Sequence, residues 1–141
     1  MPQTRADIFS RVTSLCIGDP FRFTRAVSPF DFDNQPTGLI DQVFRIEAQT
    51  QEVIGGFNYS EDRTDLFTIY LARKQNAEPQ TAYLALIEDV CSLTSAIIRD
   101  GSTGGGDFHV PDGGEVRFQH DDGREFAVAS LALPINYEAQ V

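Results

Sequence analysis

Two histidines and several nearby aspartates are the residues of this chain best suited to hold a metal ion. They are His109 and His120, with the carboxylates of Asp107, Asp112, Asp121 and Asp122 close by. Imidazole and carboxylate groups together suit zinc or a harder cation. Their spacing matches no known ligand signature, however, and Asp121-Asp122-Gly123 is typical of a turn. We therefore expect no metal site.

A glycine-rich stretch, Gly101 to Gly106, resembles a phosphate-binding loop in composition only. It follows a predicted helix instead of a strand, and it has no Gly-Lys-Ser/Thr. The third glycine of a G-x-G-x-x-G pattern would fall at His109. Residues 101–114 hold six glycines, so we interpret this region as a flexible contact loop.

Nucleophilic catalysis needs a nucleophile, a base and a group that orients the base. Cys16 and Cys91 both fall on apolar faces of predicted helices, which predicts buried and inert thiols. No G-x-S-x-G or H-E-x-x-H pattern occurs. Among 21 acidic residues a carboxylate pair is always available, but no pair has distinctive surroundings. We therefore expect no enzyme activity and no cofactor.

The charge of the chain is uneven. The net charge is −10, which disfavours tight sequence-independent binding to a phosphate backbone. Residues 1–25 nevertheless carry a net +2, whereas the remainder carries −12. Solubility alone explains an acidic surface, but this asymmetry could also steer the N-terminal end of one copy onto an acidic face of another. The chain has no apolar leader, and no run of 18 apolar residues predicts a membrane span.

The apolar pattern predicts two helices. The first begins at a capping box formed by Thr4 and Asp7 and ends at Gly18. The second spans about 79–99, closed by Asp100-Gly101. Its predicted apolar stripe contains Tyr83, Leu84, Ile87, Val90, Cys91, Thr94, Ile97 and Ile98.

Alternating residues predict four strands, at about 42–49, 65–73, 115–120 and 127–137, with residues 60–65 in a connection. Asp121-Asp122-Gly123 is predicted to join the last two as a hairpin. Pro134 cannot donate to a ladder, so it predicts an edge, a bulge or the end of pairing. Phe21 and Phe23 alternate with arginines, and we interpret them as core residues rather than as a base-stacking surface.

The resulting order is α-β-β-α-β-β. We expect one α+β domain over residues 1–141, with a mostly antiparallel sheet and two helices packed on one face.

Three short segments are candidates for contacts with other subunits or partners. Arg5 and Arg11 supply the positive charge of the first helix. Phe30, Asp31, Phe32 and Asp33 form an aromatic and acidic loop, whose phenylalanines either dock into a partner or fold back on the sheet. Asp107, Phe108 and His109 lie in the glycine-rich contact loop.

In order and spacing, the whole outline resembles the tail terminator (tail completion) family of long-tailed bacteriophages and gene transfer agents. The likeness covers nearly the full length. It rests on the opening helix Ala6 to Ile17, the strands Val43 to Glu47 and Asp65 to Arg73, the long helix Tyr83 to Ile98 and the ending Leu131 to Tyr137. The 101–114 loop and the insertion near 30–33 depart from the family outline.

The resemblance implies a structural virion protein that forms a hexameric ring and uses neither catalysis nor a cofactor. Such a ring caps the tail tube protein, meets a head-side connector protein, and lets DNA pass through its lumen without specific binding. The implied location is the virion tail at the head–tail interface, after assembly in the host cytoplasm, with no membrane. Alternatives are another head–tail connector, stopper or minor tail component, or a small ligand-binding or enzyme domain.

Overall fold

The computed structural model describes residues 4–26, 32, 41–54, 60–74, 79–103, 108–111, 114–119 and 126–140. Within them the chain forms two helices and six strands. In chain order these are α1 (Arg5–Ile17), β1 (Thr24–Arg25), β2 (Val43–Ile54), β3 (Ser60–Lys74), α2 (Pro79–Thr103), β4 (Phe108–His109), β5 (Glu115–Gln119) and β6 (Phe126–Gln140). The predicted α+β class is confirmed, and the predicted order gains the two short strands β1 and β4.

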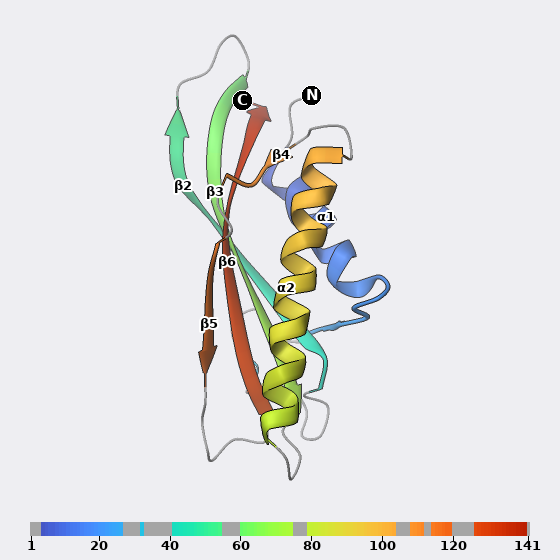
Figure 1. The fold of residues 1–141 in the computed structure, drawn as a ribbon. Helices are drawn as coiled ribbons and strands as arrows, with labels where there is room; N and C mark the ends of the chain where they lie inside the picture. The colour runs from blue at the N-terminus through green and yellow to red at the C-terminus, as the bar shows by residue number, and fades with distance from the viewer. Residues whose placement is uncertain are drawn as a thin grey trace.

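The strands form one sheet in the order β1-β2-β3-β6-β4, with β5 also paired to β6. Among the described strands, only the short β1–β2 pair is parallel. Because β3 pairs with β6 along its whole length, β4 and β5 share the other side of β6. Both helices cover the same face of this sheet, as predicted (Figure 1).

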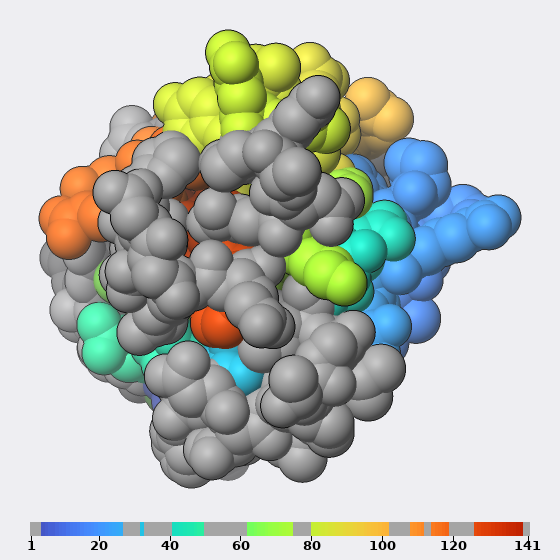
Figure 2. All heavy atoms as spheres, turned by 90° about the horizontal axis from the view of Figure 1, so that it is seen from below, coloured from blue at the N-terminus to red at the C-terminus, as the bar shows by residue number. Residues whose placement is uncertain are grey.

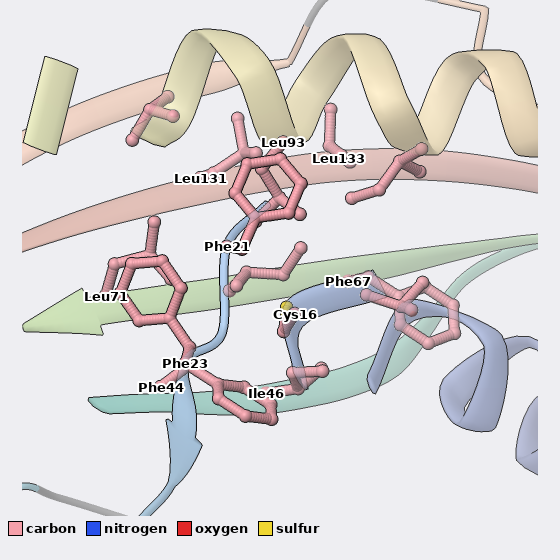
Figure 3. Close-up of a cluster of buried hydrophobic side chains, with 14 of the residues drawn as sticks. Cys16, Phe21, Phe23, Phe44, Ile46, Phe67, Leu71, Leu93, Leu131 and Leu133 are labelled. Atoms are coloured by element: carbon pink, nitrogen blue, oxygen red, sulfur yellow. The ribbon is translucent and has the colours of Figure 1, made fainter. Parts of the chain in front are cut away.

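The main core lies between that face and the helices. α1 contributes Ile8, Val12 and Cys16, and α2 contributes Ala82, Leu86, Val90, Leu93 and Ile97. Alternate residues of β2, β3 and β6 meet them, as Figure 3 shows for Phe44, Phe67 and Leu133. Phe21 and Phe23 are 8% and 2% exposed, which confirms them as core residues.

α1 begins as its sequence predicts. The Thr4 side chain accepts a hydrogen bond from the Asp7 backbone N–H, and the Asp7 carboxylate accepts one from the Thr4 N–H. These bonds satisfy donors that the first turn of a helix leaves without an intrahelical partner. The same bonds lower the pKa of the exposed Asp7. The capping box therefore fixes where the chain enters the core.

Three predicted boundaries are wrong. The strand predicted at about 42–49 does not end there, because β2 continues to Ile54. Ser60 to Asp65 belong to β3 and not to a connection, because β2 and β6 pair with this segment from both sides and bond its backbone. Asp100-Gly101 does not close α2, which continues to Thr103. There Gly101 lies directly beneath Phe108, and a Cβ on it would come within 2.5 Å of that ring. Part of the predicted flexible loop is thus packed structure.

Pro134 lies inside the longest antiparallel pair, opposite Leu66. On its other side, β5 pairs up to Ala132 and β4 pairs from Asn136. The proline therefore falls between these two short strands, at a local edge in the described ladder, which agrees with its missing N–H. The predicted Asp121-Asp122-Gly123 turn lies outside the described residues.

A second, smaller cluster lies on the sheet face away from the helices. It contains Ala26, Phe32, Val43, Ala72, Phe126 and Val128. The Phe32 ring meets Phe126 edge-on, with 6.2 Å between centroids, and Arg45 lies over it at 5.5 Å. Phe32 therefore folds back onto the sheet, one of the two outcomes expected for this segment.

Candidate interaction surface

The candidate contact residues of α1 are bound within the chain. Arg5 donates from Nε to Asp65 Oδ2 at 2.7 Å and from Nη2 to Oδ1 at 3.2 Å. This hydrogen bonding raises the pKa of Arg5, although burial opposes the shift. Arg11 binds the carboxylate of Asp100 at 3.1 Å and lies 4.8 Å from the Phe108 ring centroid. Both arginines are therefore paired within the chain, and the side chain of Arg5 is still 39% exposed.

Of the other candidate contact residues, two are buried, one is exposed and four lie outside the described residues. Phe32 and Phe108 are 4% and 3% exposed, so each gives most of its surface to the chain's own core. His109 is exposed at the tip of β4, paired with Asn136. Phe30, Asp31, Asp33 and Asp107 lie outside the described residues. The partner contacts assigned to all of these residues stay a prediction.

The described part of the chain contains few of the candidate metal ligands. Of the candidate ligands, only His109 is described; His120, Asp107, Asp112, Asp121 and Asp122 lie outside. Among the described residues, no three His, Cys, Asp or Glu side chains cluster closely enough to hold an ion.

The two thiols differ, contrary to the prediction that both are buried. Cys16 is fully buried among core side chains, and this desolvation raises its pKa to about 12 (Figure 3). Cys91 is exposed on α2. The expected placement of Cys91 failed because the apolar residues of α2 form two stripes rather than one wide stripe.

The stripe that packs on the sheet is Ala82, Leu86, Val90, Leu93 and Ile97. A second set, which we call the α2 flank, consists of Leu84, Ile87, Cys91, Thr94 and Ile98. Its spacing alternates between three and four residues, the pattern of a helix–helix seam. Leu84 is 53% exposed and Ile98 is 39% exposed, while Ile87 and Thr94 are half-buried. The flank is thus an apolar surface that the core does not absorb.

Contacts on either side of α2 locate the flank. Asp89 and Asp100 bind Arg73 of β3 and Arg11 of α1, so that side of the helix faces α1 and β3. On the other side, the rings of Tyr83 and Phe118 lie 5.1 Å apart, so α2 there adjoins β5. Leu84 and Cys91 lie two positions, about 200° around the helix, from the core residues Leu86 and Leu93, which puts the flank on the outer side of α2, away from the sheet.

β5 extends this apolar surface. Val116 and Phe118 share the helix-covered face, because they pair with Leu131 and Ala129, which are fully buried there. Phe118 is partly buried against the core, but Val116 remains 39% exposed. The α2 flank thus exposes apolar side chains on the outer side of α2, and Val116 exposes one on the β5 side of the molecule.

The opposite lateral side, formed by α1 and β1, has its own exposed apolar residue. Ile17 at the end of α1 is 51% exposed. It follows Arg11 by six positions, roughly 120° around the helix from the side that faces α2. Viewed from below in Figure 2, α2 lies at the top, the blue N-terminal segment on one side and the orange β5 on the other. Exposed apolar groups thus occur on both sides of the helical layer.

Two surface hollows border the helices. One of about 390 Å³ lies between Pro20, Phe21 and the outer side of α2, where Cys91, Ser92, Ser95, Ala96 and Arg99 line it. Another of about 290 Å³ lies between α1 and α2 beside Arg11 and Asp100. Both are lined mainly by small or already paired side chains, and neither gathers a nucleophile, a base and an orienting group.

The sequence interpretation also missed a buried polar triad. Asp65 is fully buried, and it accepts hydrogen bonds from Arg5 and from the Tyr137 hydroxyl. The signal was present, since Asp65 continues the alternation of Phe67, Ile69 and Leu71 on the inner face of β3. The triad ties α1 to β3 and β6, which is a structural role.

α2 also passes a simple test for a membrane span. By length and composition alone, the segment Gln80–Gly101 is long and apolar enough to cross a membrane. Of its most apolar 18-residue window, 28% is buried within the protein. Core helices of soluble proteins pass the same test, and α2 places five of its 25 residues in the main core. Much of the apolar helix α2 therefore lies at the surface.

No family model and no curated protein sequence matches the chain.

Proposed function

We propose that this chain is a tail terminator of a long-tailed bacteriophage or gene transfer agent. In this role, copies of the chain form a ring, hexameric by analogy with the family. The ring caps the end of the tail tube, stops its growth and meets the head-side connector. The proposal needs no catalytic group and no cofactor.

The observation that carries the proposal is the presence of exposed apolar side chains on both lateral sides of the helical layer. Val116 is exposed on the β5 side and Ile17 on the α1 side, and Leu84 and Ile98 are exposed on α2 between them. A protein with a different patch on each side can bind its own copies head to tail, and such contacts close into rings when the rotation allows.

Two further features support the proposal. The order of elements on which the family resemblance rests is present, with the closing strand β6 paired to β3 along its whole length. The net charge of −10 also suits a ring through which DNA passes, because each phosphate contact would add salt-dependent affinity and slow the DNA.

Negative-stain electron microscopy of the concentrated protein, with and without Mg²⁺, tests the proposal first. Rings with a central hole wide enough for a DNA duplex are expected. A second arm adds the protein to tubes assembled from the tail tube protein of the same genome, and capped tubes of arrested length are expected. Protein that forms no rings and leaves tube growth unchanged contradicts the proposal. Binding at the capsid vertex alone would instead indicate a connector or stopper.

A further inference from the structure

We propose that two copies of this chain pair through their α2 flanks, with the two α2 helices antiparallel and related by a two-fold axis. The contact goes beyond the proposed function, because a two-fold pair is complete at two copies and is not a contact between neighbours in a ring. It covers the outer side of α2, whereas the ring contacts use the lateral sides of the helical layer. Its occupant is a second copy of this chain, in a reversible dimer.

The spacing of the flank suits a partner helix. Leu84, Ile87, Cys91, Thr94 and Ile98 alternate in steps of three and four residues, as the contact positions of paired helices do. Leu84 and Ile98 are 53% and 39% exposed, and the core stripe of the same helix already packs on the sheet. In Figure 2, α2 lies at the top of the molecule, so another copy can approach its outer side. A second helix therefore matches the shape of this surface.

The charges of α2 favour another copy of the same helix. α2 carries four charged residues, and its two aspartates bind Arg73 and Arg11 within the chain. The other two, Glu88 and Arg99, are exposed. Glu88 precedes Cys91 by three positions and Arg99 follows it by eight, so they lie about 60° and 80° from Cys91 in the same direction around the helix. One edge of the flank thus carries an acid and a base, which a copy running in the opposite direction complements.

An antiparallel pair brings these charges together. When contact positions alternate across the seam, Ile87 of one copy meets Ile98 of the other. Glu88 then lies two positions, about 3 Å along the helix axis, from Arg99 of the second copy, on the same edge. The two-fold axis repeats this pairing, so each dimer gains it twice. In a parallel pair, the charged edge would instead face the uncharged edge that contains Ile87 and Thr94.

A hollow beside the flank accommodates the acid of the second copy. It measures about 390 Å³ and lies between Pro20, Phe21 and α2, where Ser95 and Arg99 form part of its lining. These two residues of α2 lie on the charged edge of the flank. In the antiparallel pair, Glu88 of the second copy would therefore reach the opening of the hollow beside Arg99.

The length of the seam determines how strong the dimer is. From Leu84 to Ile98 the seam runs about 21 Å along the helix. A contact of this extent falls at the lower end of interface sizes, below about 1,200 Å² in total, which is typical of reversible association. We therefore expect a dimer that forms at high protein concentration and dissociates on dilution.

A membrane is the other surface that could cover an apolar helix. Inserting α2 would withdraw its core residues from the sheet and would separate Asp89 from Arg73, whose charged atoms lie 2.6 Å apart. It would also carry Glu88 and Arg99 toward hydrocarbon, where a charged side chain is costly. These losses make the second copy the better occupant, and vesicle binding is kept as an outcome of the experiment.

Disulfide trapping tests the antiparallel register. Ile87→Cys and Ile98→Cys are each made in a Cys91→Ser background, which removes the exposed native thiol, while Cys16 is buried. Under mild oxidation at high protein concentration, each variant alone should give little covalent dimer, because its two new thiols lie eleven positions, about 16 Å, apart along the pair. An equal mixture of the two variants should give dimer efficiently. A variant with both cysteines should form dimers and no larger species.

Three results of this experiment would overturn the proposal. The first is dimer formed by Ile87→Cys alone as readily as by the mixture, since that indicates parallel helices. The second is a mixture that gives no dimer. The third is a ladder above the dimer from the variant with both cysteines, since that indicates a head-to-tail contact.

Failure of this contact is distinguishable from failure of the proposed function. A trapped dimer from a protein that forms no rings and caps no tubes would support the α2 contact and reject the tail terminator role. Rings and capped tubes from a protein whose mixture gives no trapped dimer would support that role and reject the α2 contact.

Sedimentation velocity provides an independent measurement. Glu88→Arg should raise the dissociation constant of the dimer about tenfold, since two like-charge contacts replace two ion pairs. Adding Arg99→Glu should restore dimerisation, because the two charges are then exchanged on the same edge. Arg117→Glu, which reverses an exposed charge on β5, is the matched control and should leave dimerisation unchanged. A wild type that stays monomeric, with or without binding to phosphatidylglycerol vesicles, or a double variant that does not recover, would contradict the α2 contact.

Discussion

Tyr137 donates a hydrogen bond to the fully buried Asp65 over 2.5 Å, from β6 to β3. The two residues are diagonal neighbours, because Asp65 pairs with Ile135 and Tyr137 pairs with Arg63. Arg5 reaches the same carboxylate from α1 at 2.7 Å. The carboxylate therefore holds three elements together at one end of the sheet. Burial, followed by the bond to Asp65, raises the pKa of Tyr137.

Breaking this triad should destabilise the chain without unfolding it. Tyr137→Phe removes one charge-assisted bond and should lower the free energy of unfolding by about 2 kcal/mol. Asp65→Ala should cost roughly 3 kcal/mol, the low end for a broken buried pair, because Arg5 is 39% exposed and water can solvate it. Urea unfolding with an unchanged m-value measures both effects.

The matched control is Glu115→Gln. It breaks an ion pair with Arg117 in which the two side chains are 64% and 74% exposed, and it should change stability by less than about 0.5 kcal/mol. Equal stability of Asp65→Ala and the wild type would mean that the carboxylate does not hold α1 in place.

The two thiols should differ in reactivity. At pH 8, Ellman's reagent should modify only Cys91 in the folded protein, because Cys16 is buried and its pKa is raised from 9.0 to about 12. Denatured protein should release signal from both thiols, and Cys91→Ser should abolish the signal from the folded protein. Rapid reaction of two thiols in folded protein would contradict the placement of Cys16.

The same shift predicts alkaline destabilisation. A raised pKa means that the fold favours the neutral Cys16 thiol. Its contribution is therefore complete below pH 9.0 and is lost as the pH rises toward about 12. Cys16→Ala should be less stable at pH 7, yet it should lose less stability than the wild type between pH 9 and pH 11. Parallel pH curves for the two proteins in urea unfolding would argue against this linkage.

Gly101 should not tolerate a side chain. A Cβ there would lie 2.5 Å from the Phe108 ring and 2.7 Å from its carbonyl oxygen. In a free helix, Ala is more favourable than Gly by about 1 kcal/mol. The clash should reverse that sign, so we expect Gly101→Ala to destabilise by about 1–3 kcal/mol, as overpacked sites do. Thermal unfolding measures the change, and a stabilised variant would show that β4 does not pack on α2.

Electrostatic steering should be tested at Arg25 and not at Arg5 or Arg11. Those two arginines bind Asp65 and Asp100 within the chain, so reversing their charge would disturb the fold itself. Arg25 is exposed and lies 5.7 Å from the Phe9 ring centroid. Arg25→Glu should slow assembly in low salt and have little effect in high salt, because the Debye length falls as salt rises. A salt-independent defect in light scattering would exclude steering.

The amino-acid pattern determined the local structure of this protein well. The Thr4–Asp7 capping box, the burial of Phe21 and Phe23 and the inward face of β6 follow from neighbours in sequence. Helix caps and strand alternation depend on residues a few positions apart, so a single chain carries that information. The α+β class follows, because segments with these periods have few ways to bury their apolar faces.

Only the tertiary structure determined which apolar residues of α2 remain outside the core. Leu84, Ile87 and Cys91 look like core residues in sequence, but the sheet accepts only the stripe that contains Leu86, Val90 and Leu93. A helix can touch a flat sheet along one stripe, so a second stripe must face elsewhere. Periodicity alone does not predict which of the two stripes packs on the sheet.

The ion-pair partners of the charged residues likewise could not be predicted from the sequence. Arg5 finds Asp65 across sixty positions, and Arg11 finds Asp100 across eighty-nine. Both arginines looked available to a partner because their counterions come from distant segments that the fold brings alongside α1. Local composition fixed the charges that this chain carries, whereas the packing of α1 against the sheet and α2 decided which of them remain at the surface.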